Sequence, residues 1–437
     1  MSNGETQYTA ATATSIVIAN MVGTGVFTSL GFQLVDIDAA PVILLLWVIG
    51  GIVALCGALC YAELGAALPR SGGEYNFLSR IYHPGVGFVG GWVSATVGFA
   101  APTALAAITA ATYFGAVVPQ APVKLVAAGL LLLVTAVHVG SRRSGGGFQL
   151  GFTALKVLLI LLFVAFAFWQ APELQSVRWA PMASDAVLVG SAGFAVALIY
   201  VNYAYTGWNA ATYLVGEVAD ANRKLPRILL VGTVVVASLY LLLHVMFLSV
   251  APMDAMRGKL EIGYVVAESA FGEAGSALVG LMLAILLVST VSAMVLAGPR
   301  VLQVVGQDFA ALRLLARENR HGVPHIAICV QTAVSLLLIV TSTFEVILVF
   351  SSFVLALNTL LAVVGVFVLR VRQPELARPF RIPLYPWPAL IYIAITVWTL
   401  VFVALSRPVE ALFAAGLVGA GICMYWMSAG TRVSLRD

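Results

Sequence analysis

Long apolar runs are the feature that most constrains this chain. A helix needs about 20 apolar residues to cross the hydrocarbon core of a membrane, and twelve such runs follow one another along the sequence. Only 10% of the residues are charged, against about 25% in an ordinary soluble domain. This composition excludes a soluble enzyme, a secreted domain and a disordered chain, and it predicts an all-α polytopic membrane protein with 12 transmembrane helices. The expected spans lie near residues 12–35, 42–68, 86–118, 122–140, 148–170, 186–212, 228–250, 265–299, 324–342, 344–369, 388–406 and 408–429.

The basic residues predict how the chain is oriented. If the loops alternate between the two sides of the membrane, 17 of the 23 Lys and Arg residues fall on one side and five on the other, while Lys156 lies inside a span. Lys and Arg gather in cytoplasmic loops. Both termini are therefore expected in the cytoplasm.

Several other classes receive no support from the sequence. The four cysteines lie within apolar runs, so no disulfide framework is expected. The first residues lack a basic segment and a cleavage pattern, so no removable signal peptide is expected. The interruptions between runs are too short to hold a domain of their own, and a net charge of +4 gives no indication of nucleic-acid binding.

Glycine interrupts the first span near its middle, in the segment Gly23-Thr24-Gly25. Glycine costs about 1 kcal/mol per position relative to alanine in a helix, and it lets the backbone approach a ligand closely. Non-helical backbone at this depth is tolerated only where it lines a cavity or is buried in protein. The alternative is a small-residue packing face, which is common in membrane helices.

The sixth span has a similar interruption, which favours the first interpretation. It reads Tyr203-Ala-Tyr-Thr206-Gly207-Trp-Asn209 at its middle. Interrupted spans at corresponding positions of two halves indicate a transporter binding site between inverted repeats. Free N–H groups at a half-helix N-terminus suit a carboxylate, and free carbonyl groups suit an ammonium, so the two breaks together suit a zwitterion.

Two ionisable residues lie within the spans. Lys156 sits well inside the fifth span, and an intramembrane charge is by default a candidate functional residue. Its expected partners are the carbonyl groups freed around Met21–Gly23, where an ammonium would replace a bound sodium ion; the alternative is that Lys156 snorkels to the headgroups. Glu63, close to Arg70, is expected in an interfacial ion pair or at a helix end rather than in a proton relay.

Spans one, three and six contain no Asp, Glu, Lys or Arg. A site for a cationic substrate usually supplies a carboxylate, and a site for a dicarboxylate usually supplies an arginine. The substrate's side chain is therefore expected to be uncharged.

These motifs resemble those of the amino acid–polyamine–organocation (APC) transporters, closest to the L-type amino acid transporter, or light-chain, branch. Asn20-Met-Val-Gly-Thr-Gly-Val-Phe27 is similar to the first-helix signature, and Tyr203-Ala-Tyr-Thr-Gly-Trp-Asn209 to the sixth-helix signature of that branch. Further similar stretches run from Tyr61 to Tyr75, from Gly216 to Arg227 and from Glu375 to Pro383. The matches are in order and span nearly the whole chain.

The resemblance implies a LeuT-type fold with unwound helices 1 and 6. Helices 1–5 within residues 1–170 and helices 6–10 within residues 186–371 would form inverted repeats, and helices 11 and 12 within residues 387–429 would lie outside them. It also implies that Lys156 stands where sodium-independent members carry a lysine in place of sodium, and that Tyr203 is an aromatic gate. The substrate carboxylate would meet Thr24 and the Gly25 amide, and the ammonium would meet carbonyls at Met21, Tyr203 and Thr206. The predicted substrate-binding set is Met21, Gly23, Thr24, Gly25, Tyr203, Ala204, Thr206, Gly207 and Asn209.

Some positions depart from the family's pattern. Thr24 replaces a usual serine and keeps its hydroxyl, whereas Thr206 replaces a frequent glycine and should narrow the side-chain pocket. Ala293 stands where an arginine-exchanging relative has a tryptophan, which argues against a guanidinium substrate. The loop between spans three and four has no cysteine. A disulfide-linked heavy chain is therefore not expected, and a stand-alone permease in a bacterial inner (plasma) membrane fits better.

The sequence thus predicts a sodium-independent secondary transporter of neutral L-amino acids that exchanges or facilitates by alternating access, with the lipid bilayer as its surroundings. No cofactor and no metal are expected. Proton-coupled symport is the alternative, because Lys156 itself can titrate if desolvated; a non-transporting amino acid sensor is a further one. An enzyme is not expected, because no catalytic motif or cluster of carboxylates lies in the spans.

Overall fold

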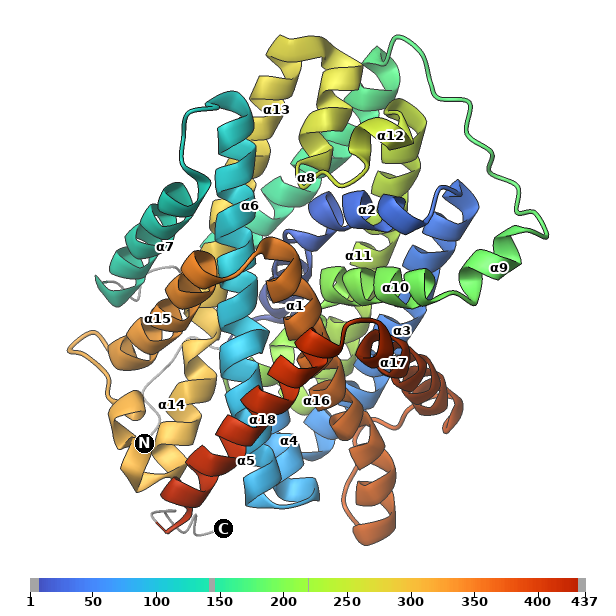
Figure 1. Ribbon diagram of the computed structural model, residues 1–437. Coiled ribbons are helices and arrows are strands. Elements are labelled where there is room, and N and C mark those ends of the chain that lie inside the picture. Colours follow the sequence, from blue (N-terminus) through green and yellow to red (C-terminus); the bar gives the residue numbers. More distant parts are fainter. Residues whose placement is uncertain (1–7, 141–145, 219, 431–437) are drawn as a thin grey trace.

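The computed structural model describes residues 8–140, 146–218 and 220–430 as a bundle of helices around one long central rod (Figure 1). The rod consists of α5, a π-helical segment η1 and α6, and it runs through much of the height of the molecule. Both chain termini, which were predicted to lie in the cytoplasm, are outside the described residues. So are four of the basic residues used for that prediction: Arg142, Arg143, Arg432 and Arg436.

The first half of the chain contains one broken helix followed by long helices. Its first helix begins at a hydroxyl cap, because Thr9 Oγ1 accepts a hydrogen bond from the Thr12 amide at 3.1 Å, and proline occupies the first turn of α3 and α5. The elements are α1 (Ala10–Met21), α2 (Gly25–Asp36), α3 (Ala40–Ala67), α4 (Glu74–Ile81), α5 (Pro84–Val93), η1 (Ser94–Ala100), α6 (Ala101–Val117), α7 (Val123–Gly140) and α8 (Gly146–Gln170).

The second half also contains a helix that is broken near its middle. This helix, α10, again begins at a hydroxyl cap, because Ser191 Oγ accepts from the Phe194 amide at 3.1 Å. The long eighth run is kinked at Gly272, whose φ of 70° favours glycine. The elements are α9 (Asp185–Val189), α10 (Ala192–Tyr205), the 3₁₀ helix η2 (Ala210–Glu217), α11 (Ala221–Val250), α12 (Met253–Met256), α13 (Ile262–Ala297), α14 (Pro299–Asp308), η3 (Ala310–Ala316), α15 (His325–Thr341), α16 (Phe344–Arg372), α17 (Trp387–Ser406) and α18 (Pro408–Ala429).

Helices from corresponding positions of the two halves pack against each other. The pairs are α3 with α11, α6 with α13 and α7 with α15. A two-fold relation between helices 1–5 and 6–10 would bring such pairs together near its axis. The inverted repeat itself stays a prediction.

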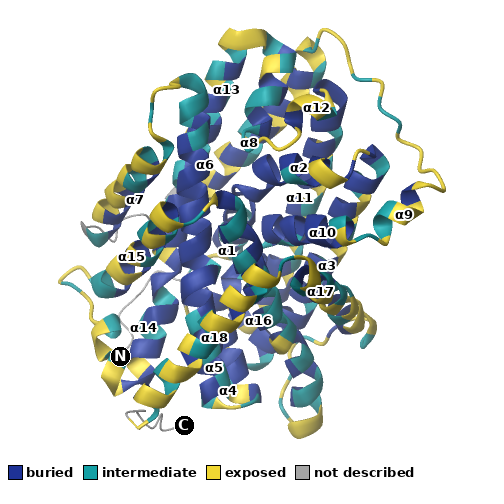
Figure 2. Ribbon diagram, in the orientation of Figure 1, coloured by how far each residue is buried: buried dark blue, intermediate teal, exposed yellow. Residues whose placement is uncertain are grey.

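The outer helices carry an apolar surface. In the described part of the chain, nine helical segments are long and apolar enough to cross a membrane, and two apolar helices, Val123–Val139 and His325–Thr341, are shorter. Each of the twelve predicted ranges contains a helix, although the count of twelve crossings stays a prediction. Figure 2 shows buried residues along α1, α6 and α10 and exposed ones on α7 and α18. Those exposed side chains include Leu133, Leu412 and Trp426, as expected of a surface that faces lipid.

Candidate functional site at the helix breaks

The first predicted interruption is present between α1 and α2. Helix α1 ends at Met21, and Val22 leaves helical geometry with ψ of 84°. Helix α2 begins at Gly25, and the Thr24 side chain makes no capping hydrogen bond to its first turn. The first N–H groups of a helix have no partner within that helix, and together with the helix dipole they attract an anion. This terminus can therefore receive a carboxylate.

The second interruption follows α10 and rests directly on the end of α1. Thr206 has ψ of 148°, and Gly207 has φ of 102°. A Cβ atom at Gly207 would lie 2.8 Å from the carbonyl carbon of Asn20. Position 207 thus needs glycine both for its backbone conformation and for the close approach of the two breaks.

Three further contacts join the two breaks. A Cβ atom at Gly25 would lie 2.4 Å from Ala204 Cα, so α2 and α10 meet backbone to backbone. The hydroxyl groups of Thr24 and Tyr203 are 3.4 Å apart. From α11, the Tyr240 hydroxyl donates to the carbonyl groups of Met21 at 2.6 Å and Ala204 at 2.9 Å. The sequence analysis missed Tyr240, which lies in an ordinary apolar run.

The ammonium of Lys156 reaches the first break from α8. Lys156 is buried, and its Nζ donates to the Val22 carbonyl at 3.0 Å and to Thr290 Oγ1 of α13 at 3.1 Å. The carbonyl lies within the predicted range Met21–Gly23. The side chain therefore ties α8 and α13 to the non-helical turn, and it does not extend toward the membrane surface. The role of Lys156 as a substitute for a bound sodium ion stays a prediction.

The carbonyl groups predicted to bind an ammonium differ in how far they are already occupied. The Met21 carbonyl accepts from the Tyr240 hydroxyl and from the Gly23 amide at 2.8 Å. The Tyr203 carbonyl accepts from the Thr206 amide at 2.9 Å and from Thr206 Oγ1 at 2.6 Å. A carbonyl oxygen has two lone pairs, so an ammonium must displace a donor at both positions. No described hydrogen bond uses the Thr206 carbonyl, which leaves it the most accessible of the three.

A small cavity lies beside the second break. Its volume is about 50 Å³, and its lining includes Tyr203, Thr206 and Trp208 together with residues of α3, α16 and α17, none of them charged. One water occupies about 30 Å³ of liquid, so the cavity has room for one or two waters. This cavity is therefore smaller than an amino acid, and a ligand bound there requires the residues around it to move apart.

Asn209 faces away from the other predicted site residues toward a buried carboxylate. Its Nδ2 donates to Glu74 Oε1 at 2.7 Å. Glu74 begins α4, ahead of the third predicted span. The expectation concerned only the charged residues within spans one, three and six, and Glu74 lies outside these spans. The spans themselves are free of charge, but the segment that leads into the third span supplies a carboxylate.

Glu63 forms an ion pair, but its partners do not include Arg70, the basic residue close to it in the sequence. Arg370 Nη2 lies 2.6 Å from Glu63 Oε2, and Arg378 Nε lies 3.7 Å from Oε1. Arg70 instead binds Asp308 of α14 at 2.8 Å. Glu63 and Arg370 are 307 residues apart and Arg70 and Asp308 are 238 residues apart, so local sequence could not reveal either pair.

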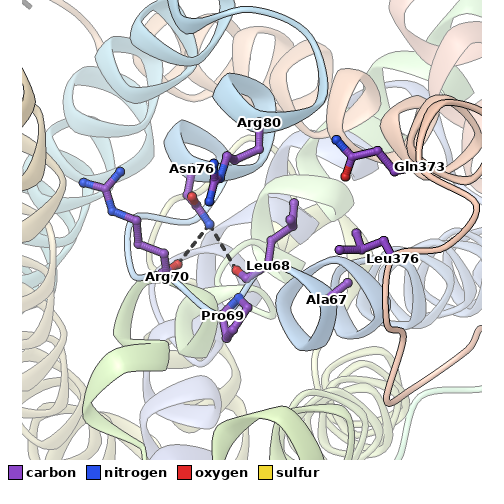
Figure 3. A pocket seen from close by; sticks show the side chains of 8 residues that line it. All are labelled: Ala67, Leu68, Pro69, Arg70, Asn76, Arg80, Gln373 and Leu376. Atoms are coloured by element: carbon purple, nitrogen blue, oxygen red, sulfur yellow. Dashed lines mark hydrogen bonds between the residues drawn. The ribbon is translucent and has the colours of Figure 1, made fainter. Parts of the chain in front are cut away.

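A larger pocket of about 430 Å³ lies at the loop between α3 and α4 (Figure 3). Asn76 Nδ2 closes the turn there by donating to the carbonyl groups of Leu68 at 3.1 Å and Arg70 at 3.2 Å. None of the predicted site residues lines this pocket. Its lining residues are Ala67, Leu68, Pro69, Arg70, Asn76, Arg80, Gln373 and Leu376.

The sequence profile of the amino acid permease family matches residues 9–425. The chain belongs to this family. The permease is 28% identical over 445 residues to the human large neutral amino acids transporter small subunit 2, covering 95% of this chain and 79% of that protein. It is 27% identical over 425 residues to the human b(0,+)-type amino acid transporter 1, covering 94% and 86% of the two chains. It is 26% identical over 439 residues to the mouse Asc-type amino acid transporter 1, covering 95% and 79%.

These relatives are amino acid transporters and not enzymes. The resemblance to the APC superfamily and its L-type branch is thereby confirmed. The permease is a multi-pass membrane protein with an amino acid as its substrate class.

Proposed function

We propose that the permease is a sodium-independent secondary transporter of neutral L-amino acids that works by alternating access, as an exchanger or a facilitator. The observation that carries this proposal is the contact between two broken helices, with Gly25 against Ala204 and Gly207 against Asn20. The two breaks would then present an uncapped helix N-terminus and a carbonyl without a described hydrogen bond to the two ends of one zwitterion.

A neutral substrate side chain fits the surroundings of the second break. The cavity beside Thr206 is lined by aromatic, hydroxyl and small side chains, and no charged residue lines it. A cationic or anionic side chain there would lack a counterion, and an unpaired buried charge is strongly unfavourable. The name of the human large neutral amino acids transporter small subunit 2 supports the same class.

Sodium independence rests on Lys156. Its ammonium lies between the Val22 carbonyl and Thr290, and so it already supplies a positive charge at the turn where a cation would bind. A second cation at this position would be repelled by the first.

We also propose that the permease works without a disulfide-linked partner, in the inner (plasma) membrane, with both termini in the cytoplasm. Residues 118–122, which join α6 to α7, contain no cysteine. One relative's name calls it a small subunit, so its partner requirement differs from the one proposed here.

Proton-coupled symport is the second candidate, because a specific observation favours it. Glu74 is a buried carboxyl group that bonds to Asn209 at the second break, and a proton-coupled transporter needs such a group. A non-transporting amino acid sensor would keep the same site and differ only in lacking flux.

Uptake into proteoliposomes separates these functions. Labelled neutral amino acids are offered in sodium-free buffer, with or without unlabelled amino acid inside and with or without a pH gradient. Exchange predicts uptake that internal amino acid accelerates. Uptake that requires the gradient and ignores internal amino acid indicates symport, and binding without uptake indicates a sensor.

A further inference from the structure

The connection between α3 and α4 contacts η2, the helix that follows the second break. Ser71 Oγ accepts a hydrogen bond from the Gly216 amide of η2 at 3.0 Å. Gly73, with φ of 55°, lies against the Tyr213 ring, where a Cβ atom would come within 2.5 Å of a ring carbon. Glu74 follows directly and bonds to Tyr213 as well. Residues 71–74, called here the latch segment, therefore hold η2 at three points.

The same end of the molecule is closed by the two chain segments that flank the broken helices. Tyr8, just before α1, forms an isolated parallel bridge with Val218, just after η2. Arg70, next to the latch segment, binds Asp308 at the end of α14. This is the end at which α4 and α5 lie in Figure 1. By the loop charges, it is the end expected to face the cytoplasm.

Glu74 is the centre of this closure. It is 1% exposed, and every donor that the structure describes around it is neutral. Its Oε1 accepts from the Tyr61 hydroxyl at 2.8 Å and from Asn209 Nδ2 at 2.7 Å. Its Oε2 accepts from the Tyr213 hydroxyl and, at 3.4 Å, from Ser94 Oγ. An ionised carboxylate has about four lone-pair sites, so these four donors satisfy the anion completely.

No cation balances this carboxylate among the described ion pairs. On the elements around it, Glu63 is paired with Arg370 and Arg70 is paired with Asp308. The remaining groups that face it are Tyr61 from α3, Tyr213 from η2, Ser94 from η1 and Asn209 from the break, with Asn358 of α16 and Tyr392 of α17 behind them. A buried anion without a counterion depends entirely on its hydrogen-bond donors.

We propose that Glu74 is a protonatable latch: its ionised carboxylate holds the η2 half of the broken sixth helix closed, and its protonation releases that half. This inference deepens the proposed transport function and rests on it. Two of the donors, Asn209 and Tyr213, belong to the segment after the second break, whereas Glu74 begins α4 and Ser94 begins η1. Opening of this end separates the first pair from the second.

Protonation changes the hydrogen bonds of Glu74 as well as its charge. Hydrogen bonds to an ionised acceptor are roughly twice as strong as bonds between neutral groups. A proton taken from water at this end forms an O–H bond on one carboxylate oxygen, which then donates instead of accepting. One of the four donors loses its acceptor, and the bonds to the other oxygen weaken. Glu74 is thus a positioning residue that acts on the substrate site through Asn209.

Hydrogen exchange of the η2 peptide, residues 209–217, measures the latch without relying on transport. The intact permease in nanodiscs is compared with Glu74→Gln at neutral pH and, after correction for intrinsic exchange rates, in mild acid. We expect Glu74→Gln to exchange about tenfold faster than the wild type at neutral pH, as for the loss of one charge-assisted hydrogen bond, and the wild type to reach that rate in acid. Equal protection of η2 in the two proteins at neutral pH overturns the proposal.

The pH profile of amino acid exchange provides the second test. We expect wild-type exchange to rise toward acid pH and Glu74→Gln to be insensitive to pH. Tyr213→Phe removes one of the four donors to the Glu74 carboxylate, so its profile should differ from that of the wild type. Glu74→Asp, which keeps a carboxyl group, should keep a pH-dependent profile. The control Tyr82→Phe removes a hydroxyl bonded to the Leu361 carbonyl, away from Glu74, and should leave the profile in place.

The outcomes distinguish this inference from the proposed function. A flat wild-type profile, or a Tyr213→Phe profile that matches Tyr82→Phe, overturns the latch while transport stands. Absence of exchange at every pH overturns the proposed function, and the hydrogen-exchange comparison still decides the latch. If Glu74→Gln does not fold, hydrogen exchange of η2 and the pH profile of transport are both compared between Tyr213→Phe and the control Tyr82→Phe.

Discussion

Replacing Lys156 with glutamine should disable the permease without unfolding it. The substitution keeps most of the side-chain volume but removes the positive charge that binds the Val22 carbonyl at 3.0 Å and Thr290 Oγ1 at 3.1 Å. Val22 is 1% exposed, so water cannot easily take the place of the lost donor. The turn between α1 and α2 then loses the group that fixes it to α8 and α13.

The size of the effect follows from the hydrogen bonds. A bond to a charged group contributes about 1.5–3 kcal/mol, and every ~1.4 kcal/mol is a factor of ten in an equilibrium constant. Loss of the Val22 bond alone should therefore lower the population of the substrate-competent turn by about 10- to 150-fold. Thr290→Val is the matched control: it removes one of the two acceptors of the ammonium and leaves the charge and the Val22 bond, so it should reduce exchange less than Lys156→Gln does.

Sodium-free exchange in proteoliposomes is the assay, with thermal unfolding of each purified variant as the control for folding. A Lys156→Gln permease that folds and exchanges at the wild-type rate would refute the reasoning. Thr290→Val as severe as Lys156→Gln would also refute it, because the hydroxyl and not the ammonium would then matter. Stimulation of the wild type by sodium would contradict the proposed substitution of the ion.

Three other perturbations test the site and its surroundings. Gly25→Ala should abolish exchange, because the added Cβ atom would lie 2.4 Å from Ala204 Cα. Gly23→Ala should have a milder effect, because the closest contact of its Cβ atom would be the Thr290 methyl group at 3.3 Å. Equal initial rates of exchange for the two variants would contradict this. Thr206→Gly should widen the cavity beside the second break and raise the uptake of phenylalanine relative to that of alanine. An unchanged ratio of phenylalanine to alanine uptake in a competition assay would show that this cavity does not hold the substrate's side chain. Glu63→Gln should lower the free energy of unfolding by about 1.5–3 kcal/mol, since it removes the negative charge from the pair with Arg370, whose side chain is 24% exposed; a melting temperature equal to that of the wild type refutes this.

The breaks in α1/α2 and α10 could be predicted because their cause is local. Glycine within a long apolar run weakens the helix wherever the run folds, so Gly23, Gly25 and Gly207 mark the interruptions in the sequence itself. The first and sixth apolar runs also showed which two interruptions correspond. Lys156 was recognisable for a similar reason, since a single charge in an apolar run needs a partner.

The remaining contacts depend on how distant helices pack, and sequence spacing does not carry that information. Glu63 and Arg370 are 307 residues apart, and the nearer Arg70 was a plausible partner until the fold placed it beside Asp308. Tyr240 looks like any other aromatic residue in an apolar run. Glu74 lies ahead of its span, where an acidic residue normally faces water, but in the fold it contacts Tyr61 of α3 and Tyr213 of η2.

The position of a bound amino acid decides whether the two breaks form the substrate site. Competition among the twenty amino acids selects a ligand, and electron cryomicroscopy of the permease with that ligand in nanodiscs then locates it. We expect ligand density between the two breaks, with the carboxylate at the Thr24–Gly25 end of α2, the ammonium at the Thr206 carbonyl, and the Tyr203 ring over the ligand. An amino acid bound elsewhere, with Gly25 still packed against Ala204, would contradict this expectation.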